Sequence, residues 1–300
     1  MREIATGLQF PEGPIAVPDG SVVLVEIRRR TLSRVQPDGT VEVIAELGGG
    51  PNGAAIGPDG RCYVCNNGGF EWEEIRGRKF PSGPAVDYTS GSIQAVDLET
   101  GEFETLYTEC EGHPLKGPND LVFDSAGGFW FTDHGKVRER DKDRTGIFYA
   151  RPDGSHIVEA AFPVESPNGI GLSPEGDRVY AAETPTGRVF YWDIAEPGVI
   201  ATNELSPNGG HFLAGVGGLQ MFDSLAIDGD GNVCVATLIN GGVTSISPNG
   251  EILEHFPTGD SMTTNVCFGG GDLRTAYITL SGRGALVAVD WPRAGLKLEF

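Results

Sequence analysis

A short segment that recurs along the chain restricts the possible folds of this sequence more than any other feature. In five copies, an acidic or amide residue is followed eight positions later by a glycine. The copies read PEGPIAVPDG, PNGAAIGPDG, PNDLVFDSAG, PNGIGLSPEG and FDSLAIDGDG, and a sixth, weaker copy, TNVCFGGGDL, begins near Thr264. Their starts lie 40 to 67 residues apart. This period is near that of a propeller blade with extra residues confined to loops.

Three further short apolar segments follow most copies, joined by turns rich in Gly, Pro, Asp and Asn. The second segments are SVVLVE, RCYVCN, FWFTD, DRVYAAE, NVCVAT and TAYITL; the third are TLSRVQ, SIQAVDL, GIFYARP, RVFYWDI, VTSISP and ALVAVDW; the fourth are VEVIAE, FETLYT, HIVEAA, VIATNEL and EILEHF. Such a pattern is typical of antiparallel sheet. The 45 glycines and 20 prolines in 300 residues also disfavour long helices. We therefore predict an all-β fold, a six-bladed β-propeller with four antiparallel strands per blade.

The sixth unit lacks a fourth strand, so the two ends of the chain must complete it. REIAT at 2–6 is the expected strand, and LKLEF at 296–300 is its rival. Pairing the chain ends closes the ring and removes an exposed sheet edge. A β-sandwich would not explain six repeats. We expect residues 1–300 to form a single six-bladed propeller domain.

The charge balance excludes several classes of partner. With 22 basic and 42 acidic residues the formal charge is −20, which repels nucleic acid and anionic membranes. No stretch reaches the roughly 20 apolar residues that span a bilayer. The N-terminus has no apolar run of the secretory type, so a cytoplasmic location is expected. We expect neither a nucleic acid nor a membrane as partner, and infer no obligate protein partner.

Five cysteines are too few and too scattered for a disulfide framework. Cys62 and Cys65 have the C-x-x-C spacing of metal and redox sites. They lie in a predicted strand, however, where residues three apart point to opposite faces. We therefore expect small core side chains at these positions.

The propeller geometry brings the repeated acidic and amide residues together. Equivalent positions in successive blades form a ring at one mouth of the central channel, so all of them supply oxygen atoms to one place. The ring residues are Glu12, Asn52, Asn119, Asn168 and Asp223. An all-oxygen set suits one hard divalent cation, calcium first, with zinc, manganese or iron(II) as alternatives.

Asn and Asp before Gly are also ordinary turn formers, which is the alternative interpretation of the ring. Two residues favour a metal. Glu12 is a poor turn former that keeps the register, and Asp223 lies among apolar residues where a charge needs a partner.

Four ordered motifs resemble one known family along essentially the whole chain. They are FPEGP at 10–14, GPNDLVFDSAGGFWFTD at 117–133, SPNGIGLSPEGDRVY at 166–180 and FDSLAIDGDGNVCVA at 222–236. They are similar to the family of gluconolactonase, regucalcin (the senescence marker protein) and luciferin-regenerating enzyme. The resemblance implies a six-bladed propeller with one divalent metal at the channel mouth and hydrolysis of small sugar lactones.

The resemblance also implies roles for single residues. Glu12, Asn168 and Asp223 match the metal ligands of the family. Asn119 matches a residue that contacts the substrate or joins the metal shell. Asn52 has a weaker counterpart in the family and is expected to bind substrate. In the regucalcin branch an arginine that grips the sugar acid stands where this chain has Gly117, beside Lys116.

The expected mechanism uses the metal as a Lewis acid on the lactone carbonyl and Asp223 as general base toward water. Asn119 would orient the substrate, and no G-x-S-x-G motif indicates a serine nucleophile. Among the histidines, His134 at the rim is a candidate for substrate binding or proton shuttling, against a structural role. His211 is a candidate to border the pocket.

Several features leave alternatives open. The strand ends Glu26, Asn66 and Glu183 either shape the pocket or satisfy backbone groups. The insertion at 67–90, with its aromatic residues, either covers the substrate as a lid or packs on the neighbouring blade.

The competing functions are a related hydrolase of phosphotriesters or aryl lactones, and a non-enzymatic calcium-binding propeller. A calcium ion takes about six to eight oxygen ligands. The chain offers three or four, which leaves positions for water and substrate and favours an enzyme.

Overall fold

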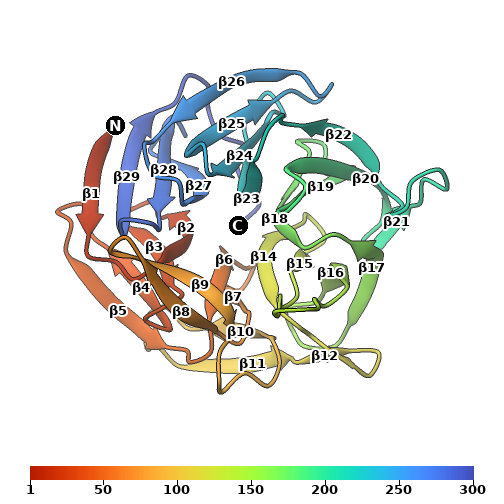
Figure 1. The fold of residues 1–300 in the computed structure, drawn as a ribbon, viewed down its shortest axis with the longest axis horizontal. Coiled ribbons are helices and arrows are strands. Elements are labelled where there is room, and N and C mark those ends of the chain that lie inside the picture. The colour runs from red at the N-terminus through yellow and green to blue at the C-terminus, as the bar shows by residue number, and fades with distance from the viewer.

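The computed structural model describes residues 1–300, and its secondary structure consists of strands alone. Six antiparallel sheets stand around a central axis as the blades of a β-propeller (Figure 1). The predicted fold class and the four strands per blade are thus confirmed, with one addition in blade four.

The strands of each blade run outward from the axis in chain order. Blade one holds β2 (Pro11–Ala16), β3 (Val22–Glu26), β4 (Thr31–Val35) and β5 (Val41–Glu46), and blade two holds β6 (Pro51–Ile56), β7 (Cys62–Asn66), β10 (Ser92–Val96) and β11 (Phe103–Tyr107). Blade three holds β14 (Pro118–Phe123), β15 (Phe129–Asp133), β16 (Thr145–Ala150) and β17 (Ile157–Val164), and blade four holds β18 (Pro167–Leu172), β19 (Arg178–Glu183), β20 (Arg188–Glu196), β21 (Val199–Ala201) and β22 (His211–Gly215). Blade five holds β23 (Met221–Ile227), β24 (Val233–Leu238), β25 (Gly242–Ile246) and β26 (Ile252–Pro257), and blade six holds β27 (Thr263–Gly269), β28 (Thr275–Leu280), β29 (Ala285–Asp290) and β1 (Arg2–Thr6).

The two ends of the chain close the ring as predicted for residues 2–6. β1 pairs antiparallel with β29, with Arg2 opposite Ala288 and Thr6 opposite Ala285. The rival segment at 296–300 forms no strand of this blade. Closure therefore leaves the propeller with only the short outer edges of its blades.

Blade four departs from the prediction of a fourth strand over 199–205. β21 ends at Ala201, and β22 then pairs with β20 as well. Between them a turn-rich loop leaves the sheet, where the N–H of Asn203 donates to the carbonyl oxygen of Gly209 at 2.7 Å. The outermost position of this blade is thus shared by two short strands.

The repeated glycine lies in the turn that joins the innermost strand to the next one. In the five regular copies its φ is positive, between 70° and 86°, a conformation that side chains with a Cβ rarely adopt. These residues are Gly20, Gly60, Gly127, Gly176 and Gly231. The fixed spacing in the sequence therefore measures the length of the innermost strand plus its turn.

The hydrophobic cores lie between successive blades. Cys62 packs in the core between blades one and two, and Cys65 packs in the core between blades two and three. Both thiols are free and buried, and the two side chains leave opposite faces of β7. The prediction that they are core residues is confirmed.

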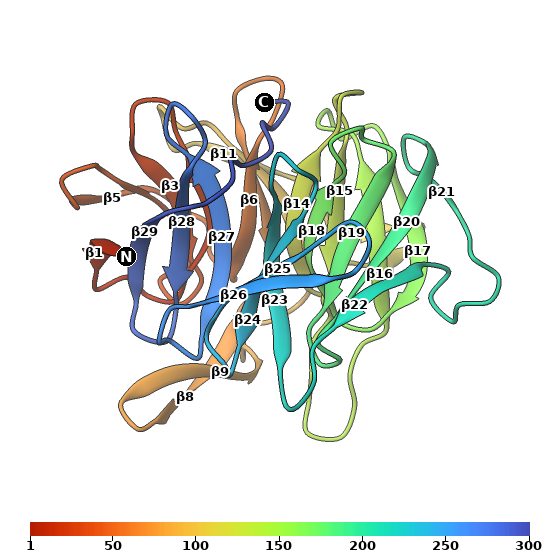
Figure 2. The ribbon, with the colours of Figure 1, turned by 90° about the horizontal axis from the view of Figure 1, so that it is seen from above.

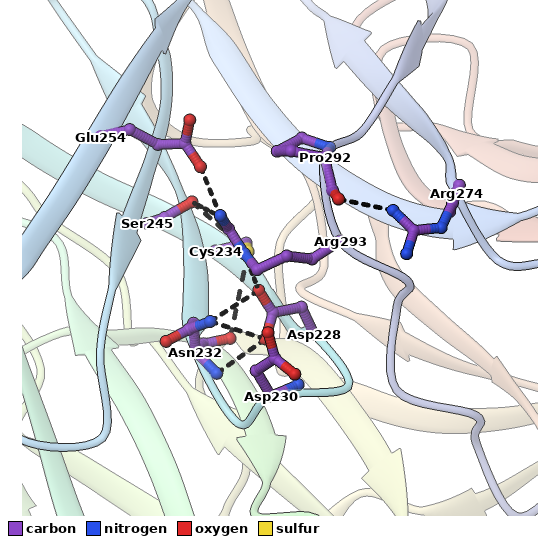
Figure 3. Close-up of polar contacts among 9 residues, drawn as sticks. All are labelled: Asp228, Asp230, Asn232, Cys234, Ser245, Glu254, Arg274, Pro292 and Arg293. Carbon is purple, nitrogen blue, oxygen red and sulfur yellow. Dashed lines mark hydrogen bonds and ion pairs between the residues drawn. The ribbon is translucent and has the colours of Figure 1, made fainter.

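The residues after β29 cross one end of the propeller and finish near its axis (Figure 1). Arg293 anchors this segment: its Nε donates to Asp228 at 2.6 Å, and its guanidinium also contacts Ser245 and Glu254 (Figure 3). The C-terminal Phe300 packs against Phe123 with ring centroids 5.9 Å apart. The structure has no helix with the length and apolarity to cross a bilayer.

A hairpin of β8 (Phe70–Ile75) and β9 (Arg78–Pro84) projects from blade two. Figure 2 shows that this hairpin and the C-terminus lie at opposite ends of the propeller. The largest group of candidate site residues lines a cavity at the end of the propeller from which the hairpin projects.

Candidate active site

A cavity of about 350 Å³ opens where the innermost strands begin. All five predicted ring residues line it, each from a different blade, and Thr264 takes the corresponding place in blade six. His134, the further predicted substrate-binding residue, also lines the wall. The ring residues that line the cavity are Glu12, Asn52, Asn119, Asn168, Asp223 and Thr264.

The pairing register shifts, by a β-bulge or a similar irregularity, at the start of every innermost strand. In blade two, for example, the pairing of β6 with β7 shifts between Pro51 and Ala54, and the other five blades shift at the corresponding place. A bulge bends the strand and re-aims a side chain. Asn52 and its equivalents thus lie in strands, not in the turns of the alternative interpretation.

The residue after the ring position sits where adjacent innermost strands approach each other. It is glycine in three blades, and a Cβ on Gly53 would lie 2.5 Å from the carbonyl oxygen of Asn119. The three glycines are Gly13, Gly53 and Gly169. Glycine is required here by close packing of backbones.

Glu12 is held by only one of its two carboxyl oxygens. Its Oε2 accepts from the N–H of Gly13 at 2.6 Å and from Nδ2 of Asn265 at 2.7 Å. Its Oε1 is buried without a partner, and the residue is 2% exposed. Burial raises the pKa of Glu12 well above its usual value, and the charges of Asp223 and Asp120 raise it further.

Asp223 keeps part of its surface open to the cavity. Burial raises the pKa of its carboxyl to about 7, the Asn168 amide and the N–H of Ser224 favour the charged form, and Asp120 opposes it. A carboxyl with a pKa near neutrality is suited to accept a proton at physiological pH.

The amide oxygens complete an all-oxygen donor set. Oδ1 of Asn119 is buried and has no partner. Nδ2 of Asn168 donates to Thr184 Oγ1 at 3.1 Å, and its Oδ1 accepts from Ser224 Oγ at 3.3 Å. No group of three or more His, Cys, Asp or Glu side chains is placed to hold a metal. A cation here would therefore depend on amide oxygens as well as on the two carboxylates.

These residues fit a divalent cation. The unpartnered Oε1 of Glu12 and Oδ1 of Asn119 are buried acceptors, and leaving such atoms without a partner is costly. Burial raises the pKa of the Glu12 and Asp223 carboxyl groups, and a cation bound between them would favour their charged forms.

Asp120 is a buried carboxyl beside the ring that the sequence did not single out. It is 6% exposed, burial raises its pKa to about 7, and its charge acts on both Glu12 and Asp223. The signal was present in the aligned repeats. Three blades have glycine after the ring residue, whereas the others have Asp120, Ser224 and Asn265.

His134 is neutral at physiological pH, because burial lowers its pKa to about 4. Its Nδ1 lies 3.2 Å from the carbonyl oxygen of Gly135, so a proton on Nδ1 makes that bond. Nε2 is then the hydrogen-bond acceptor of the imidazole.

The predicted strand-end residues do not line the cavity. Glu26 Oε2 accepts from the N–H of Gln9 at 2.7 Å, Asn66 Oδ1 accepts from the N–H of Gly50 at 2.8 Å, and Glu183 Oε1 accepts from the N–H of Glu165 at 3.2 Å. They satisfy backbone groups, which was one of the two alternatives.

His211, a candidate to border the pocket, does not line the cavity. It lies on β22 at the outside of blade four and stacks on Tyr191 with ring centroids 4.9 Å apart. The glycine-rich segment before Asp223 starts on this outer strand, so its first residues are far from the inner ring.

The insertion at 67–90 packs against a neighbouring part of the propeller and also lines the cavity. Its hairpin contributes Phe70 and residues 81–83 to the cavity wall. Trp72 packs against Phe10, which follows β1, with ring centroids 5.0 Å apart. The packing alternative is thus confirmed, whereas a lid over the substrate stays a prediction.

The rest of the cavity wall is uncharged. No Lys or Arg lines it, and Gly117 lines it where the regucalcin branch has its arginine, whereas Lys116 does not. The apolar residues of the wall are Phe10, Ile27, Phe70, Val137, Leu238 and Met262.

Comparison with known proteins shows the family to which the chain belongs. Residues 10–282 match the model of the SMP-30/Gluconolactonase/LRE-like region. The chain is similar to a gluconolactonase of Zymomonas mobilis, with 25% identity over 304 residues, 93% of this chain and 78% of the relative. It is 33% identical over 180 residues to a 6-deoxy-6-sulfogluconolactonase of Pseudomonas putida, 59% of each chain.

Among solved structures, the fold resembles that of a calcium-binding protein, regucalcin, from Agrobacterium tumefaciens. The TM-score is 0.73 at 18% identity, over 99% of this chain and 97% of the other. The family model covers most of the chain and includes every ring residue. The chain therefore belongs to the SMP-30/gluconolactonase/LRE-like family.

Proposed function

We propose that this protein hydrolyses a small lactone at the ring cavity and that the reaction depends on one divalent cation. The observation that carries the proposal is the convergence of the carboxyl groups of Glu12 and Asp223 and the unpartnered amide oxygen of Asn119 on one otherwise uncharged cavity. Relatives named as lactonases support the class of reaction.

Glu12, Asn168, Asp223 and Asn119 would hold the cation, and calcium is the ion that the oxygen donors suit best. When bound, such an ion polarises a carbonyl group and lowers the pKa of water. The calcium-binding neighbour in the family agrees with this choice.

Asp223 is the proposed general base. Its carboxylate accepts a proton from a water molecule as the water oxygen attacks the lactone carbonyl carbon. The ring C–O bond then breaks, and the proton passes from Asp223 to the departing ring oxygen. The product is the open hydroxy acid. One carboxyl group thus performs both transfers, as base toward the water and as acid toward the ring oxygen.

The remaining polar residues orient the substrate. Asn119 and Asn52 line the cavity, and Asn119 would orient the reacting ester group. Nε2 of the neutral His134 can accept from a substrate hydroxyl at the wall. The low pKa of this histidine speaks against a role as proton shuttle at neutral pH.

The cavity wall favours a lactone without an anionic substituent. A sulfonate such as the one in the name of the Pseudomonas relative would meet no basic side chain there, and burying an unpaired charge is costly. The six apolar wall residues make an aryl lactone the second candidate.

The test is a pH-stat assay with D-glucono-1,5-lactone, dihydrocoumarin and a phosphotriester. Asp223→Asn keeps the shape of the side chain and removes the base. We expect kcat to fall at least ~100-fold. Asp193→Asn, which changes a half-exposed side chain on β20, is the matched control with unchanged kcat. Full activity of Asp223→Asn or Asp223→Ala would sink the mechanism. Hydrolysis of the phosphotriester alone would reassign the substrate class.

A further inference from the structure

The amide of Asn67 is a buried donor without a partner on the wall of the cavity. Asn67 follows β7, lines the cavity and is 2% exposed, and its Nδ2 makes no hydrogen bond. A buried N–H left without an acceptor costs about 1–3 kcal/mol. Such a donor in a cavity wall indicates an acceptor on a ligand.

The orientation of this amide is fixed from the other side. Oδ1 of Asn67 accepts from Nζ of Lys136 at 3.1 Å and from the N–H of Gly69 at 2.8 Å. A flipped amide would place Nδ2 against these two donors. Hydrogen bonding therefore defines which atom is the oxygen, and Nδ2 is the free end of the group.

Lys136 is itself fully enclosed. It is 1% exposed, its Nζ also donates to the carbonyl oxygen of Gly69 at 2.8 Å, and Nζ lies 3.9 Å from the ring centroid of Phe70. Burial lowers its pKa to about 7, although Asp133 and Asp143 raise it. The ammonium and the neutral amine can both donate to the two oxygens, so the contact persists in either form.

We propose that Asn67 binds the substrate through Nδ2 and that Lys136 is the positioning residue that orients its amide. The inference rests on the proposed function in that the ligand is a lactone. The free atoms of Glu12 and Asn119 in this cavity are acceptors. Asn67 supplies the donor that a carbonyl, ring or hydroxyl oxygen of a lactone requires.

Two substitutions separate these roles from folding. Asn67→Asp keeps an oxygen for Lys136 and Gly69 and replaces only the donor. Lys136→Met keeps the apolar stem and removes Nζ. The matched controls are Asn240→Asp, at an exposed position, and Lys79→Met, on the β8–β9 hairpin with a side chain 42% exposed.

Binding is followed apart from catalysis by the fluorescence of Trp72. This indole packs against Phe10 of the cavity wall, and the other three tryptophans are buried. The probes are D-glucono-1,5-lactone and 1,5-anhydro-D-glucitol, a cyclic ether with the same hydroxyl pattern that cannot be hydrolysed. We expect Asn67→Asp and Lys136→Met to weaken binding and raise KM roughly 5- to 20-fold, with kcat changed less than about 3-fold.

A double-variant comparison tests whether Lys136 acts through Asn67. If it does, Asn67→Ala combined with Lys136→Met binds as weakly as Asn67→Ala alone, because coupled residues are not additive. Additive losses would overturn the positioning role. Wild-type protein that binds neither probe, or Asn67→Asp with wild-type affinity, would overturn the substrate contact. Binding without hydrolysis of any lactone would instead refute the proposed function and leave the contact supported.

Discussion

At the scale of single residues, Asp120 influences how the two functional carboxyl groups ionise. It lies one position after the ring, where three other blades have glycine. Its negative charge raises the pKa of both Glu12 and Asp223. Blade six carries Asn265 at the equivalent place, which indicates that an uncharged amide fits this position.

Asp120→Asn should therefore shift the pH dependence of hydrolysis. Removing the neighbouring charge lowers the pKa of Asp223, so the base is deprotonated at lower pH. The acid limb of the kcat/KM profile should move down by about 0.5–1 pH unit. The measurement is a pH-stat series between pH 5 and 9, with Asp38→Asn in an exposed turn as the control. An unshifted or upward-shifted limb would contradict this electrostatic role.

The ring residues could be predicted because one residue per blade keeps a fixed distance from a glycine. Asp120, Thr264 and Asn67 could not be predicted in the same way. Asp120 and Thr264 break the repeat pattern, and the role proposed for Asn67 depends on a contact with Lys136, 69 residues away in the sequence.

At the scale of elements, the innermost strands must approach each other closely for the ring to form. A Cβ at Gly53 would lie 2.5 Å from both the carbonyl oxygen of Asn119 and the Cα of Asp120. These are backbone atoms of the neighbouring innermost strand, so the strand itself would have to move.

Gly53→Ala should therefore destabilise the protein and disturb the ring. We expect a loss of about 2–4 kcal/mol in the free energy of unfolding and a fall in kcat/KM of roughly 10-fold or more. Urea unfolding and the lactone assay measure the two effects. Gly217→Ala is the control, because a Cβ there meets no atom within 4 Å and its φ is not positive. Equal stability of the two variants would show that the strands tolerate a wider spacing.

Strand positions were predictable from alternating turns and apolar segments, which local chemistry determines. The β8–β9 hairpin and the divided outer edge of blade four were not. Both lie in insertions that interrupt the repeat, where no second copy gives a register for comparison.

At the scale of the whole molecule, the closed ring forces acidic groups together. Without a cation, burial raises the pKa of Asp120 and Asp223 to about 7 and that of Glu12 well above its usual value. A carboxyl with a raised pKa in the folded state stabilises fully below its unfolded pKa, near 4. That contribution is lost as the pH rises through about 7.

The metal-free protein should therefore be less stable at pH 8 than at pH 5.5. We expect a difference of about 2 kcal/mol or more, or roughly 4 °C in Tm. Calorimetry in EDTA at the two pH values measures it. Saturating calcium should reduce the difference because a cation favours the charged carboxylates, and Asp223→Asn should reduce it because one titrating group is gone. A metal-free Tm that is equal or higher at pH 8 would contradict the prediction.

Metal dependence of lactone hydrolysis is the most direct test of the whole account. The protein is stripped with EDTA, its metal content is measured, and hydrolysis of D-glucono-1,5-lactone and dihydrocoumarin is followed with and without added calcium, zinc or manganese. The account predicts a fall in kcat/KM of at least ~100-fold on stripping and recovery with one equivalent of a divalent ion. Full lactonase activity in protein shown to hold no metal would contradict it.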